Sequence, residues 1–193
     1  MKMRIQNIAL AALSAAAMLT APTLLAVDEG LRTESQLALT NFLKADTTLE
    51  KFFSNSAGYA IFPNVGKGGF IVGGARGKGL VYDKANVVIG QATMTQASIG
   101  AQVGGQTFAE LIFFETPSAL EDFKSSKLEM SAEVSAVAAR EGASKVADYK
   151  NGVVVFTVAK AGLMVQASIG GQKFKFEPEP LQATGRETPK KEE

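Results

Sequence analysis

Residues 58–82 read GYAIFPNVGKGGFIVGGARGKGLVY, a stretch in which short runs of β-branched and aromatic residues alternate with glycines. This composition is typical of twisted antiparallel strands joined by tight turns, and it continues towards the C-terminus. We therefore expect an α+β fold with a glycine-rich, mainly antiparallel twisted sheet or barrel. The expected strands are 59–62, 69–75, 79–82, 87–91, 94–102, 108–114, 153–158, 163–169 and 173–176.

The segment before this stretch has apolar residues at spacings of three, four and seven, which predicts amphipathic helix. Thr47 and Glu50 have the spacing of a capping box, so we expect one helix to about Lys44 and a second from Thr48. The apolar stripe is expected to dock on the protein core. A helix that lies on a membrane is the alternative, but acidic residues outnumber basic ones along this segment.

Two further elements follow the expected strand 108–114. Thr116 and Pro117 are typical of an N-cap and a first helical position, and they predict a helix near 117–125. Residues 127–140 have helix-favouring composition, yet their apolar and polar residues alternate five times in succession. This alternation favours a strand.

The two ends of the chain differ from its centre. Residues 1–26 combine a basic start, an apolar run from Ile8 to Ala21 and small residues before Val27, which is the pattern of a signal peptide. Residues 178–193 are polar and rich in proline, and we expect a disordered tail there. The expected organisation is a signal peptide, a single domain at 27–177 and this tail, in a protein exported to the periplasm without a transmembrane helix.

The composition excludes several functions. The chain has no Cys and no His, which excludes disulfides, thiolate and imidazole catalysis and the usual zinc sites. For the same reason we expect no lipoprotein anchor, which needs an N-terminal Cys. Removing Lys2 and Arg4 with the signal peptide leaves 18 basic against 19 acidic residues, so nucleic-acid binding is not expected. We expect no cofactor and no metal.

The glycine-rich stretch contains the candidate binding residues. Its Gly-Lys pairs are not followed by Ser or Thr, so a nucleotide-binding P-loop is not supported. Lys67, Arg76 and Lys78 instead lie beside glycines whose backbone N–H groups can form an anion-binding concavity. A tight hairpin tip with solvated basic side chains, formed around Gly77 and Gly79, is the alternative interpretation.

Several ordered blocks resemble the SYLF domain, also called the Ysc84 actin-binding domain. They are residues 58–63, 68–74, 77–82, 97–106, 109–110 and 159–163, and the similarity covers about 31–177. The loop Arg140-Glu-Gly-Ala143 departs from the family pattern. The resemblance implies a non-catalytic lipid-binding module, because eukaryotic members bind phosphoinositides through a basic surface and an N-terminal amphipathic helix, and some bind actin.

For an exported bacterial protein the resemblance implies anionic phospholipid as the partner and makes actin unsuitable. Lys67, Arg76 and Lys78 are then the expected lipid-binding residues, with no catalytic residue. Two rivals stand beside this function. One is a structural or protein-interaction domain of the envelope, and the other is an enzyme that uses carboxylates such as Asp83, Glu110 or Glu115.

Overall fold

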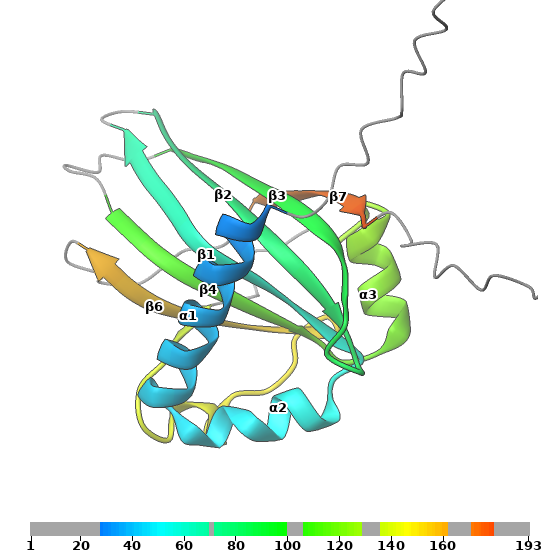
Figure 1. The fold of residues 1–193 in the computed structure, drawn as a ribbon. Coiled ribbons are helices and arrows are strands. Elements are labelled where there is room, and N and C mark those ends of the chain that lie inside the picture. Colours follow the sequence, from blue (N-terminus) through cyan, green and yellow to red (C-terminus); the bar gives the residue numbers. More distant parts are fainter. Residues whose placement is uncertain (1–27, 70–71, 100–105, 129–135, 162–170, 180–193) are drawn as a thin grey trace, which may run out of the picture.

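The computed structural model describes residues 28–69, 72–99, 106–128, 136–161 and 171–179 (Figure 1). Within these ranges the fold is α+β, as expected. Its helices are α1 (Glu29–Ala45), α2 (Glu50–Asn55) and α3 (Pro117–Lys124), with short 3-10 helices η1 (Thr47–Leu49) and η2 (Ala143–Val146). Its strands are β1 (Gly58–Gly69), β2 (Val72–Asp83), β3 (Val88–Ile99), β4 (Gln106–Phe114), β5 (Ala136–Ala138), β6 (Val153–Ala161) and β7 (Gln172–Pro178).

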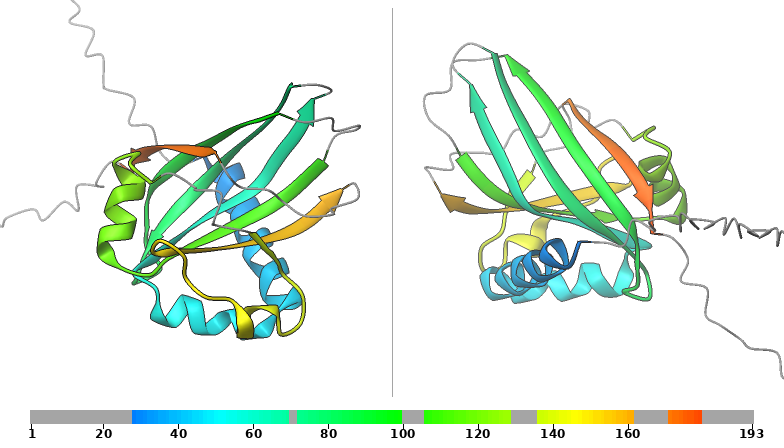
Figure 2. Two further views of the ribbon diagram at one scale, coloured as in Figure 1. Left: turned by 180° about the vertical axis from the view of Figure 1, so that it is seen from behind. Right: turned by 45° about the horizontal axis from the view of Figure 1, so that its top comes forward.

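The strands form one open sheet in the order β5-β6-β4-β1-β2-β3-β7. All neighbours are antiparallel except β5 and β6, which are parallel. The sheet is strongly bent, and β7 at its end lies next to α3 (Figure 2). Accordingly, Phe174 of β7 lies with its ring centroid 5.8 Å from that of Phe62 on β1, three strands away.

Alternate residues of each strand supply two hydrophobic clusters, one on each face of the sheet. The face that we call the α1 face is covered by α1 and α2, and Phe42 of α1 is fully buried there among Ile61, Leu80 and Leu111. The opposite α3 face is covered by α3, where Phe123 packs against Phe114 and Phe174. The apolar stripe of α1 therefore docks on the protein core.

The glycines of β2 and β3 lie inside continuous strands, so the expected breaks at 76–78 and 92–93, and the hairpin tip around Gly77 and Gly79, are wrong. The reason is packing across the sheet. A Cβ atom added to Gly79 would lie 2.6 Å from the ring of Phe62, and one added to Gly90 would lie 2.6 Å from the ring of Phe176. These glycines leave room for aromatic rings on adjacent strands.

The corner between α1 and α2 is capped by Asp46 and not by the predicted pair Thr47 and Glu50. The carboxylate of Asp46 accepts bonds from the backbone N–H and the hydroxyl of Thr48, and from the backbone N–H groups of Gly142 and Ser144. Asp46 thus links the helical corner to η2. The Gly142 backbone is in the left-handed region with φ of 75°, which favours glycine in the loop that departs from the family pattern.

The expectations for residues 117–125, 127–140 and 163–169 have different outcomes. The helix at 117–125 is confirmed, with the Thr116 hydroxyl accepting from the N–H of Ala119. Of the strand expected over 127–140, the described residues contain β5, whereas Lys127 and Leu128 are not part of a strand because their N–H groups bond to the Asp122 carbonyl at the end of α3. Residues 129–135 and the expected strand at 163–169 lie outside the described residues.

Candidate functional site

The predicted basic residues do not all share one face of the sheet. Arg76 and Lys78 of β2 are exposed and alternate with buried residues of the α3 face, so both lie on the α1 face. Lys67 of β1 is in register with Ala75, which is buried on the α3 face. Residues directly opposite on antiparallel strands belong to the same face, so the position of Lys67 is on the other side of the sheet from Arg76 and Lys78.

Strand β7 adds two basic residues that sequence reasoning missed. Phe174 is buried on the α3 face, and its neighbours Lys173 and Lys175 are exposed on the α1 face. Lys173 pairs with Thr95, and Lys175 pairs with Thr93. The alternation of Lys and Phe along residues 173–176 was the signal that could have placed both lysines on one outward face.

Pairing through β3 brings these lysines beside the residues of β2. Thr95 pairs with Arg76 on its other side, and Thr93 pairs with Lys78. We call the surface formed by Arg76, Lys78, Lys173 and Lys175 the basic patch. Figure 2 shows that β1, β2 and β3 extend beyond the helices at one end of the sheet, and all four side chains of the patch are exposed.

Acidic groups border the patch on the side nearest to α1. The Nζ of Lys175 lies 2.7 Å from Oε1 of Glu177. The hydrogen bond and the charge of Lys175 lower the pKa of Glu177, and the charge of Lys78 contributes in the same direction. A hollow of about 240 Å³ beside Lys78 is also lined by Asp28 and Glu34. Among the described residues, the ion pairs found involve neither Arg76 nor Lys173.

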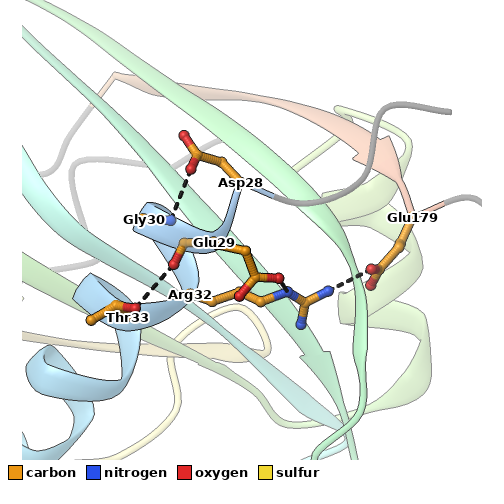
Figure 3. Close-up of polar contacts among 6 residues, drawn as sticks. All are labelled: Asp28, Glu29, Gly30, Arg32, Thr33 and Glu179. Atoms are coloured by element: carbon orange, nitrogen blue, oxygen red, sulfur yellow. Dashed lines mark hydrogen bonds and ion pairs between the residues drawn. The ribbon is translucent and has the colours of Figure 1, made fainter. Parts of the chain in front are cut away.

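The first turn of α1 is fixed to the residue that follows β7 (Figure 3). The guanidinium of Arg32 donates a hydrogen bond of 2.5 Å to the carboxylate of Glu179. Asp28 caps the helix, because its carboxylate accepts a hydrogen bond from the N–H of Gly30. The backbone N–H of Glu179 also bonds to the carbonyl of Ile89. Pro178 and Glu179, which the sequence assigned to the disordered tail, therefore belong to the described fold: Pro178 ends β7, and Glu179 holds the first turn of α1 beside the patch.

The three candidate catalytic carboxylates are not brought together. Glu110 is fully buried on the α3 face, where its Oε2 accepts from the side chain of Gln172. Asp83 instead accepts from the N–H groups of the β2–β3 turn, and Glu115 is exposed. Burial raises the pKa of Glu110 to about 7, and the bond from Gln172 opposes this only partly.

The described ranges contain neither a membrane-spanning helix nor a cluster that could hold a metal. No helix in them is both long and apolar enough to cross a bilayer. In the same ranges, no three acidic residues come together with metal-binding geometry.

Two comparisons relate the chain to known proteins. Residues 95–179 match the family described as "Ysc84: Las17-binding protein actin regulator". The chain is also 25% identical over 144 residues to "Beta cell expansion factor A" of the bacterium Aeromonas veronii. The alignment covers 75% of this chain and 55% of that protein, so the chain spans about half the length of the relative. The family match includes Thr95, Lys173 and Lys175.

Proposed function

From the match to the Ysc84 family, which confirms the resemblance to the SYLF domain, we propose that this protein is a non-catalytic module that binds anionic phospholipid headgroups at a membrane surface. The observation that carries the proposal is the basic patch, in which four exposed cationic side chains lie together on neighbouring strands, beside the first turn of α1. Without residues 1–26 the chain as a whole is nearly neutral, with 18 basic and 19 acidic residues. Attraction to an anionic membrane would therefore be local and short-ranged.

The membrane itself is proposed to be part of a bacterial envelope. The signal-peptide pattern of residues 1–26 supports export, and the relative comes from a bacterium. A protein exported from a bacterium does not meet actin filaments, so we do not extend the actin part of the family description to this chain. N-terminal sequencing of the periplasmic protein tests export, and a protein that keeps residues 1–26 in the cytoplasm contradicts it.

Arg76 and Lys78 remain proposed lipid-binding residues, and we add Lys173 and Lys175. Lys67 is proposed as a separate lipid contact, since its position in β1 is on the opposite face of the sheet. The contributions of the two faces are separable, because a variant that neutralises the patch leaves Lys67 unchanged.

Co-sedimentation with vesicles tests the proposal. The protein is expected to bind vesicles that contain phosphatidylglycerol, to bind neutral phosphatidylcholine vesicles poorly, and to dissociate as salt rises from 0.1 to 1 M. Neutralising Arg76, Lys78, Lys173 and Lys175 with alanine should abolish most of the binding. Lys84 and Lys127, which are exposed outside the patch, provide a control variant with alanine at both positions.

Two outcomes oppose the proposal. Equal binding to neutral and anionic vesicles excludes recognition of charged headgroups. Absence of binding to both favours a structural or protein-interaction domain, for which β7 offers a surface because it is the last strand of the sheet.

A further inference from the structure

The basic patch includes one pair of basic residues on β2 and one pair on β7. A pair of threonines on the intervening strand β3 lies in register with both. Arg76 and Lys78 belong to β2, Thr95 and Thr93 to β3, and Lys173 and Lys175 to β7. The pairing produces two parallel rows across the sheet, Arg76–Thr95–Lys173 and Lys78–Thr93–Lys175. Each row therefore has a threonine hydroxyl between two cations.

The dimensions of a β-sheet fix the size of this arrangement. Adjacent strands lie about 4.8 Å apart, so the two cations of a row have backbones roughly 10 Å apart. The long side chains of Arg and Lys can lean towards the threonine from both sides. Successive residues on one face are roughly 7 Å apart along a strand, which is the separation of the two rows.

One row supplies the donors that a phosphoryl group requires. Two cations can each donate charge-assisted hydrogen bonds to its oxygens, and the threonine hydroxyl can donate a third bond. Two equivalent rows supply two such sets of donors at a fixed separation. A ligand with one phosphate would use only one set.

We propose that the basic patch binds a single lipid headgroup that carries two phosphoryl groups, one on each row, as in a diphosphatidylglycerol. This proposal rests on the proposed function and specifies its ligand. The two phosphates of such a headgroup are joined by a short glycerol bridge, which is of the same order as the row separation. Binding both phosphates to one protein makes the second contact intramolecular.

The two rows differ in their acidic neighbours. The row Lys78–Thr93–Lys175 lies beside Glu177, whose carboxylate pairs with Lys175, and beside the hollow lined by Asp28 and Glu34. A pair as exposed as Lys175 and Glu177 is weak and can exchange for a phosphate. The row Arg76–Thr95–Lys173 has no ion pair among the described residues and should bind its phosphate more strongly.

Vesicle binding by the full chain tests this inference. Diphosphatidylglycerol and phosphatidylglycerol are each mixed into phosphatidylcholine, with half the mole fraction of diphosphatidylglycerol so that the surface charge is equal. The protein is expected to bind the diphosphatidylglycerol vesicles about tenfold more tightly. The double variant Arg76→Ala/Lys173→Ala should bind the two kinds of anionic vesicle with about equal affinity, whereas the Lys84→Ala/Lys127→Ala control should keep the preference. Circular dichroism establishes that both variants are folded.

The outcomes separate the two proposals. Equal affinity for the two anionic vesicles overturns the two-phosphate site but leaves the proposed function intact. Absence of binding to either anionic vesicle overturns both. Loss of the preference in the Lys84→Ala/Lys127→Ala control also overturns the two-phosphate site, because the preference would then follow net charge.

Discussion

The carboxylate of Glu110 on β4 accepts a 2.9 Å hydrogen bond from the side-chain amide of Gln172 on β7, although three strands separate β4 from β7 in the sheet. This bond spans the α3 face and shows how far the sheet bends. The other carboxylate oxygen has no partner among the described residues. A buried carboxyl of this kind is costly to ionise, which makes it a sensitive probe of the fold.

Stability should fall as pH rises from about 4.5 to about 7 because of Glu110. Its pKa is raised in the fold, so the native state keeps a proton that the unfolded state has lost. Glu110 does not destabilise the fold at pH values below its pKa in the unfolded state. Above its pKa in the folded state, it lowers the free energy of unfolding by roughly 3 kcal/mol. Glu110→Gln should remove this slope and stabilise the protein at pH 8, as measured by urea unfolding at several pH values. A variant that is less stable than the parent at pH 8 contradicts the prediction.

Asp46 should have the opposite dependence on pH. Its burial opposes ionisation, but hydrogen bonds from Thr48 and Ser144 outweigh burial and lower its pKa to about 2. The stability that it contributes is present above the unfolded pKa near 4 and is lost as pH falls towards 2. Asp46→Ala leaves several N–H groups without their acceptor and should cost about 2–4 kcal/mol at pH 7. Denaturant unfolding at pH 7 and pH 3 checks this, and an equal loss at both values would argue against the ionised form.

Gly79→Ala should destabilise the sheet, because its Cβ would lie 2.4 Å from the carbonyl oxygen of Ile61 as well as against the ring of Phe62. Such overpacking typically costs about 1–3 kcal/mol. Gly66→Ala is the matched control on the neighbouring strand, where an added Cβ meets nothing within 4 Å. Thermal unfolding should show a lower Tm for Gly79→Ala alone. Similar losses in the two variants would mean that glycine is needed for its backbone and not for packing.

The ion pair between Arg32 and Glu179 should contribute modestly to holding α1. Both side chains are partly exposed, at 30% and 18%, so a coupling of about 1 kcal/mol or less is expected. A double-mutant cycle with Arg32→Ala and Glu179→Ala measures this coupling. Hydrogen exchange in the first turn of α1 should rise in both single variants. Unchanged exchange would show that the apolar contacts of α1 hold this turn alone.

The extent to which sequence predicted the fold depended on how local each signal was. The cap and proline at Thr116 and Pro117 predicted α3 correctly, because both act on the backbone within one helical turn. Thr47 and Glu50 had the same kind of local signal, but Asp46 is the residue that caps the corner. It also accepts hydrogen bonds from the N–H groups of Gly142 and Ser144, which are distant in sequence. Gly79 was mistaken for a turn residue because the Phe62 ring that requires it lies on another strand.

The candidate site shows the same division. The sequence by itself determined the α+β class, the absence of Cys and His chemistry and the two-residue alternation that sets Lys173 and Lys175 on one face of their strand. Only the tertiary structure decided that Arg76 and Lys78 lie on this same face of the sheet, and that the position of Lys67 is on the other face. The physical reason is that side-chain alternation fixes directions only within a strand. The register between strands is set by packing of the whole sheet, which brings residues from distant parts of the chain into the same rows.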